Sequence, residues 1–186
     1  LELIFITIQY TSIICLLKQN CVLLDFFIMN SESISNPYLI AEVGLAHEGS
    51  LGIALSYCDA VKKSGFDAIK FQMHLPKYES TLQEMFRIKF SKEYKNRYEY
   101  WDRTSFSEVN WSILKDHCKS IDLSVGISPF SVKALDISRE IGFDFIKIGS
   151  GEIYNDSLLD SLSLQDHVIA SFGMSPISDV DLRVNK

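Results

Sequence analysis

Charged and hydroxyl residues recur along the chain, each time at the end of a short apolar segment. These segments, which read as β-strands, are 37–44, 67–72, 123–130, 143–151 and 167–173. Because side chains alternate between the two faces of a strand, one face takes the Ile, Val and Phe residues. The other face, or the turn that follows it, receives the polar set Glu42, Lys70, Gln72, Ser128, Lys147, Ser150, Glu152 and Ser171.

Two lysines in this set point to a bound anion. Lys70 and Lys147 would face the same interior, where burying an ammonium group without a counter-charge is costly. The groups that would complete a cradle for phosphate or carboxylate belong to Ser128, Ser150, Ser171, Gly149 and Gly151. Two acids at the same strand ends, Glu42 and Glu152, suit sugar hydroxyls or proton transfer. A single such residue is ordinarily solvated, but recurrence on successive strands favours a site.

The histidines give a weaker signal. His47 lies in the first strand-to-helix loop and His74 just past the second strand, so both are positioned to reach the same end of the sheet. The spacings typical of metal sites, such as HxH, HExxH or two histidines with a carboxylate, do not occur in the sequence. We therefore assign no metal ligand to the residues of this chain.

Helices are expected between the strands, at 50–64, 105–120, 131–141 and 155–163. Ser50 is expected to cap the first helix, and Ser105 with Glu108 to form the S-x-x-E capping box of the second. Gly65 and Gly142 suit the left-handed position that ends a helix. Strands that alternate with helices predict an α/β fold with a parallel sheet, either an open doubly wound sheet or a barrel.

In a barrel, the polar face would be the interior, and active sites are built at the carboxyl ends of the strands. No GxGxxG pattern follows the first strand and no P-loop occurs, which disfavours dinucleotide binding. The formal net charge of −6 over 186 residues and a pI near 5.2 argue against nucleic-acid binding. The segment 83–103 is basic and aromatic but also holds acids, and it reads as a solvated lid over the strand ends. The four cysteines form no CxxC pair, so we expect a reducing, cytoplasmic location.

Residues 1–28 do not fit this pattern. They are rich in Leu, Ile and Phe and do not begin with Met. Their longest uncharged run, 3–17, is shorter than the roughly 20 residues of a membrane-spanning helix. We interpret 1–28 as an upstream or non-native extension that is dispensable, with a membrane anchor as the alternative. Residues 29–36 then form a polar lead, and 37–186 hold the fold.

Five blocks of the sequence resemble the sialic acid synthase family in order and spacing. They are AEVGLAHEGSLGIA, AIKFQMH, SVGISPFSVKALD, IKIGSGEIYN and ASFGMS, and they span roughly 37–176. The resemblance implies a TIM (β/α)8 barrel, of which residues 37–186 would form the truncated N-terminal part, about five of the eight βα units.

The resemblance also implies the reaction. The complete enzyme would condense phosphoenolpyruvate with an N-acetylated hexosamine, such as N-acetylmannosamine, to give a nonulosonic (sialic) acid and phosphate. It would act as a homodimer and use a divalent metal, Mn²⁺ or Mg²⁺, held by residues beyond Lys186. This chain would be inactive alone. A related 3-deoxy-sugar-acid phosphate synthase stays an alternative, although it needs a second cradle for the phosphate of its sugar; a fragment without catalysis of its own is another.

The same resemblance implies roles for the polar set. The residues that would bind phosphoenolpyruvate are Lys70, Ser128, Lys147, Ser150 and Ser171. Glu42 and Glu152 would be catalytic and, together with Gln72, would face the sugar. Two positions depart from the family pattern, because Ala46 stands where an Asn is usual and Phe172 where a small hydroxyl residue is usual.

Overall fold

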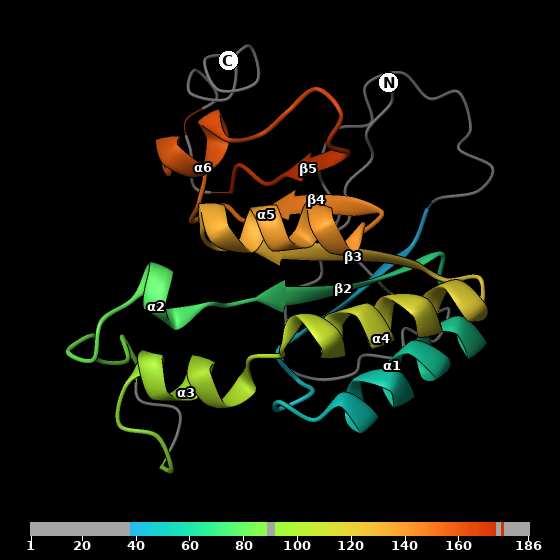
Figure 1. The fold of residues 1–186 in the computed structure, drawn as a ribbon, viewed down its shortest axis with the longest axis horizontal. Helices are drawn as coiled ribbons and strands as arrows, with labels where there is room; N and C mark the ends of the chain where they lie inside the picture. Colours follow the sequence, from blue (N-terminus) through green and yellow to red (C-terminus); the bar gives the residue numbers. More distant parts are fainter. Residues whose placement is uncertain (1–37, 89–91, 174–175, 177–186) are drawn as a thin grey trace.

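Five parallel strands form the sheet of this α/β protein (Figure 1). The computed structural model describes residues 38–88, 92–173 and 176. The strands are β1 (Ile40–Gly44), β2 (Ala68–Met73), β3 (Ser124–Pro129), β4 (Phe145–Ile148) and β5 (Val168–Ala170). They pair in chain order, β1-β2-β3-β4-β5, whereas a doubly wound sheet reverses its order at a switch point. The sheet is therefore an arc of a (β/α)8 barrel.

The described residues also form six helices. They are α1 (Leu51–Lys63), α2 (Pro76–Glu79), α3 (Arg97–Thr104), α4 (Glu108–Ser120), α5 (Val132–Ile141) and α6 (Asp156–Asp160). Helices α1, α4 and α5 pack on the sheet, and α1 lies beside α4, where the buried Cys118 thiol donates to Cys58 Sγ across 3.4 Å. Helices α2 and α3 belong to an insertion that extends past the carboxyl end of β2 (Figure 1).

Most helix ends follow the sequence prediction. Ser50 caps α1 by accepting from the Ile53 N–H at 3.3 Å, and Gly142 ends α5 in the left-handed region at φ 77°. The capping box predicted at Ser105 is wrong, because α3 continues to Thr104 and Ser105 is its C-cap. Ser107 instead caps α4.

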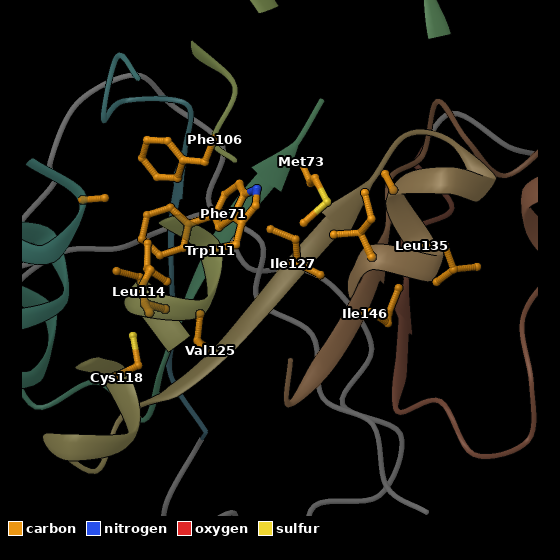
Figure 2. Close-up of a cluster of buried hydrophobic side chains, with 14 of the residues drawn as sticks. Phe71, Met73, Phe106, Trp111, Leu114, Cys118, Val125, Ile127, Leu135 and Ile146 are labelled. Atoms are coloured by element: carbon orange, nitrogen blue, oxygen red, sulfur yellow. The ribbon is translucent and has the colours of Figure 1, made fainter. Parts of the chain in front are cut away.

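The hydrophobic core lies between the sheet and its covering helices (Figure 2). Phe71, Val125 and Ile127 on the strands are fully buried, and they form one cluster with Trp111 and Leu114 of α4. Full burial of such a side chain contributes about 1.5–3 kcal/mol relative to exposure. This packing holds β2 and β3 in place and leaves their opposite face for polar residues.

Close packing also fixes the opposite, interior face. Gly126 on β3 stands in register with Phe145 on β4. A Cβ atom at Gly126 would lie 2.1 Å from Cε2 of the Phe145 ring, so the ring fills the space that a side chain would need.

We therefore predict that Gly126→Ala destabilises the protein by about 1–3 kcal/mol, because the methyl group displaces Phe145. Urea denaturation measures the free energy of unfolding. Gly52→Ala in α1 is the matched control, since its Cβ would meet no atom closer than 4.0 Å, and it should be neutral or stabilising by up to about 1 kcal/mol. Equal stability of Gly126→Ala and the original protein would contradict the packing described.

Candidate active site

The sheet register places predicted polar side chains together on the interior face. Glu42 on β1 stands opposite Lys70 on β2, which in turn stands opposite Gly126 on β3. One row further on, Gln72 stands opposite Ser128. Residues paired in register point to the same side of a parallel sheet. The alternation expected from the sequence is therefore observed on these strands.

Lys70 is the centre of this face. Its side chain is 5% exposed, and its Nζ donates to the Ser128 hydroxyl at 2.8 Å and forms an ion pair with Glu42. Burial lowers the pKa of Lys70, while the Glu42 carboxylate opposes that change. The second carboxylate oxygen, Glu42 Oε1, is buried and has no hydrogen-bond partner among the described residues. Buried polar atoms are normally paired, so this oxygen has capacity for a further hydrogen bond.

Glycine preserves the space around this carboxylate. Gly44 has a φ of +57°, and a Cβ atom there would lie 3.4 Å from Glu42 Oε1 and 3.5 Å from the Gln72 carboxamide. Glu42 and Gln72 thus border the same small space at the ends of β1 and β2.

Lys147 adds a second cation to the same environment. Burial lowers the pKa of Lys147, the charge of Lys70 lowers it further, and Glu42 opposes both. Its Nζ lies 3.9 Å from the point where a Cβ of Gly149 would sit. Two lysines against one carboxylate leave a net positive charge in a poorly solvated place, which is the electrostatic condition for binding an anion.

The two remaining serines lie at the carboxyl ends of β4 and β5. Ser150 follows β4, and its Oγ is 3.9 Å from the position of a Cβ on Gly173, so the two loops meet. Ser171 follows β5, where its N–H donates to the Ile148 carbonyl at 3.0 Å. Both are at the same edge as Lys147, but contact with a shared ligand stays a prediction for them.

Glu152 belongs to a neighbouring feature. It accepts from the Asn155 amide at 2.9 Å and lines a cavity of about 520 Å³ between the β2 insertion and the loops after β3 and β4. We call this space the insertion cavity, and its lining is His74, Tyr78, Glu79, Glu84, Arg97, Trp101, Phe130, Ser131, Val132, Glu152, Asn155 and Ser157.

His74 is the most constrained residue of this cavity. Its ring is stacked between Trp101 and Phe130, with centroid distances of 4.4 and 4.0 Å, and its Nδ1 is 2.8 Å from Glu79 Oε2. The side chain of Ser105 fixes the backbone here by donating to the His74 carbonyl at 2.8 Å. Glu84, Arg97 and Trp101, from the segment interpreted from sequence as a solvated lid, thus form one wall of the cavity. The aromatic residues of that segment were the only sequence signal for it.

His47 does not reach the strand ends, contrary to the expectation from its loop. It is fully buried on the helix side of the sheet, where its ring centroid lies 4.4 Å from Phe106 and 5.9 Å from Phe71. Its Nδ1 accepts from the Gly49 N–H at 3.1 Å. Burial lowers the pKa of His47 to about 4. The aromatic cluster around the first loop, rather than the active site, accounts for its position.

A metal site is not complete in this part of the protein. Among residues 38–88, 92–173 and 176, no group of three His, Cys, Asp or Glu side chains could hold a metal ion. Glu42 Oε1 offers one free oxygen, which is fewer ligands than Mn²⁺ or Mg²⁺ takes. The described residues alone therefore do not fit such an ion. The extension 1–28 and the lead 29–36 lie outside the described residues. Among the residues that the structure describes, no helix is long and apolar enough to cross a membrane.

The fold and interior lysines define an α/β protein built on part of a (β/α)8 barrel. The chain resembles the truncated 3-deoxy-D-arabino-heptulosonate 7-phosphate synthase of Thermotoga maritima, with a TM-score of 0.55. The two are 14% identical over 78% of this chain and 44% of that one, so the likeness supports the fold alone. A profile of the NeuB family matches residues 57–186. The chain belongs to the NeuB family.

Individual relatives agree with that assignment. The N-acetylneuraminate-9-phosphate synthase of Drosophila melanogaster is 28% identical over 163 residues, which cover 83% of this chain and 42% of that protein. The pseudaminic acid synthase of Helicobacter pylori is 29% identical over 146 residues, 75% of this chain and 42% of that protein. The sialic acid synthetase of Leptospira borgpetersenii, solved with citrate, has a TM-score of 0.65 and 29% identity over 81% of this chain and 50% of that one. The chain thus spans half or less of the length of each relative.

The neutral burial of His47 predicts how stability depends on pH. The unfolded chain takes up the proton below about pH 6.5, whereas the folded protein resists until about pH 4. The free energy of unfolding should therefore fall as pH falls through this window, by up to about 3 kcal/mol from His47.

His47→Asn keeps an oxygen near the position of Nδ1 but does not titrate. Its free energy of unfolding should therefore fall less than that of the original protein between about pH 7 and about pH 4.5. His167→Asn, at an exposed histidine, is the matched control and should follow the original protein. Urea denaturation at both pH values measures the difference. Identical pH dependence in the original protein and His47→Asn would refute the assignment.

Proposed function

We propose that the protein to which this chain belongs condenses phosphoenolpyruvate with an N-acetylated hexosamine to give a nonulosonic acid and phosphate. Membership of the NeuB family supports a synthase of this class, and the named relatives make acids of this kind. The observation that carries the proposal is the cluster formed by the buried Lys70 with the partly buried Lys147 and Glu42. Its net positive charge suits a substrate that bears both a phosphate and a carboxylate.

Each step has a part for residues of this chain. Lys70 and Lys147 hold the anionic groups of phosphoenolpyruvate while its C3 attacks the aldehyde carbon of the open-chain sugar. A new carbon–carbon bond forms, the aldehyde oxygen takes a proton, and C2 becomes an oxocarbenium ion. Water adds to C2 and gives up a proton, and in the tetrahedral intermediate the C2–O bond to phosphate then breaks as the C2 hydroxyl loses its proton and becomes the ketone oxygen of the product. Glu42 Oε1, which has no hydrogen-bond partner among the described residues, is the group we assign to one of these proton transfers.

The remaining roles extend the same proposal. Ser128, Ser150 and Ser171 would add hydroxyl donors to the anion site, while Gln72 and Glu152 would face the sugar. A divalent metal, Mn²⁺ or Mg²⁺, stays a prediction for the complete protein, and no step above depends on it. We also propose a homodimer that works in the cytoplasm.

The alternative of a 3-deoxy-sugar-acid phosphate synthase is not favoured. The likeness to the Thermotoga maritima protein is one of fold, at 14% identity, whereas the NeuB profile covers most of this chain. That residues 1–186 alone are inactive stays a prediction, to be checked by assaying phosphate release from phosphoenolpyruvate.

Substitutions in the cluster test the proposal in the protein made from the complete reading frame. Lys147→Ala should raise the KM for phosphoenolpyruvate tenfold or more, since it removes a charge-assisted contact worth roughly 1.5–3 kcal/mol. Glu42→Gln should lower kcat without weakening phosphoenolpyruvate binding, because it removes a negative charge from the anion site. Steady-state phosphate release at varied phosphoenolpyruvate concentration separates the two effects.

Lys115→Ala is the matched control, because Lys115 is a lysine of the outer helix α4 that pairs with Asp144 at 2.6 Å. It should leave both kinetic constants unchanged. An unchanged KM in Lys147→Ala, or a Glu42→Gln variant that loses only phosphoenolpyruvate affinity, would show that the roles are wrong.

A further inference from the structure

The insertion cavity adjoins the anion site along the chain. Phe130 follows Ser128 by two residues, and Glu152 follows Ser150 by two residues, and both line the cavity. Phe130 directly follows β3 and Glu152 lies in the turn after β4, so the cavity borders the carboxyl ends of these two strands. The far wall is the insertion, with Trp101 stacked on His74. The cavity is thus placed to receive the part of a substrate that extends away from the reacting carbon.

The chemistry of the proposed condensation says which part that is. The aldehyde carbon of the hexosamine must lie against C3 of phosphoenolpyruvate, so C6 is the end that extends away from the anion site. In the product, the former C6 becomes the last carbon of the chain. Relatives named as synthases of a 9-phosphate and relatives named as synthases of an unphosphorylated acid both match this chain. Family membership therefore leaves open whether C6 carries a phosphate.

The positive charge in the lining of the cavity is already paired with a carboxylate. Arg97 Nη1 donates to Glu84 Oε1 at 3.2 Å, and Glu84 also accepts from the Ser80 hydroxyl at 2.6 Å. His74 is held by Glu79, whose other oxygen accepts from the Leu75 N–H. Among the described residues that line the cavity, the Arg97 guanidinium and the His74 ring are thus each engaged with a carboxylate.

A third carboxylate, Glu152, has only the neutral Asn155 amide as its hydrogen-bond partner in the described residues. The lining therefore carries excess negative charge. A phosphate dianion placed here would face carboxylates without a spare cation, and such like-charge contacts are an effective means of rejecting a ligand. A hydroxyl group can instead donate to a carboxylate, and the Tyr78 ring suits the apolar side of a sugar chain.

We infer that the insertion cavity binds the C6 end of a hexosamine that carries a hydroxyl there and excludes its 6-phosphate. Glu84, Arg97 and Glu152 determine this specificity. The inference rests on the proposed function, because it takes the direction of the sugar from the condensation.

Binding measurements test it in the protein made from the complete reading frame. The probes are N-acetylmannosaminitol and its 6-phosphate, which lack the aldehyde and therefore cannot react, titrated calorimetrically in the presence of phosphoenolpyruvate. The unphosphorylated probe should bind at least tenfold more tightly. In Glu84→Gln, which releases Arg97 from its carboxylate, affinity for the 6-phosphate should rise at least fivefold relative to the other probe.

Asp102→Asn is the matched control, because it removes one negative charge from an exposed position of α3 outside the cavity. It should leave the ratio of the two affinities unchanged. Equal or tighter binding of the 6-phosphate, no binding of either probe, or an unchanged ratio in Glu84→Gln would overturn the inference. Phosphate release with the reactive sugars is measured separately. If the preference is found without turnover, the proposed reaction fails while the specificity of the cavity stands.

Discussion

The ion pair between Lys70 and Glu42, with Lys147 close by, is the interaction on which the rest of the site depends. Lys70 is almost completely buried, and an unpaired ammonium group in such a place costs several kcal/mol. Glu42 and the Ser128 hydroxyl satisfy it. Lys147 then adds a second positive charge, and burial and the charge of Lys70 both lower the pKa of Lys147. The arrangement tolerates this charge best when an anion is bound.

The scaffold explains how these residues come together. Three strands in parallel register bring Glu42, Lys70 and Ser128 to one face, although they are far apart in the chain. The aromatic and aliphatic core on the opposite face holds that register, because a slip by one residue would exchange the lysine for a core side chain. Gly126, covered by the Phe145 ring, closes the interior one row below Ser128.

The sequence predicted the parts that depend on short-range periodicity. Alternation along a strand has a period of two, so the shared face of Lys70 and Ser128 followed from the residues alone. The strand predicted over 143–151 was too long, since only Phe145–Ile148 pairs in the sheet and the following Gly-Ser-Gly segment turns away.

Features that depend on tertiary packing were not predictable in the same way. The aromatic cluster that draws His47 to the helix side brings together Phe71 and Phe106, which lie on separate segments. The extension of α3 to Thr104 moved the cap of α4 from Ser105 to Ser107. The insertion cavity likewise exists only because His74 stacks between residues from two distant segments, Trp101 and Phe130.

The central claim is that the buried Lys70 and the partly buried Lys147 bind an anion, and proton exchange on ligand binding tests it most directly. At about pH 9 phosphoenolpyruvate is fully ionised, since the second pKa of a phosphate ester is about 6. Bound anion should raise the lowered pKa values of Lys70 and Lys147, so the protein should take up protons as it binds. Titration calorimetry in buffers of different ionisation enthalpy measures this number. Net proton uptake that is smaller in Lys147→Ala is the predicted result, and net proton release on binding, or the same uptake in Lys147→Ala, would contradict the account.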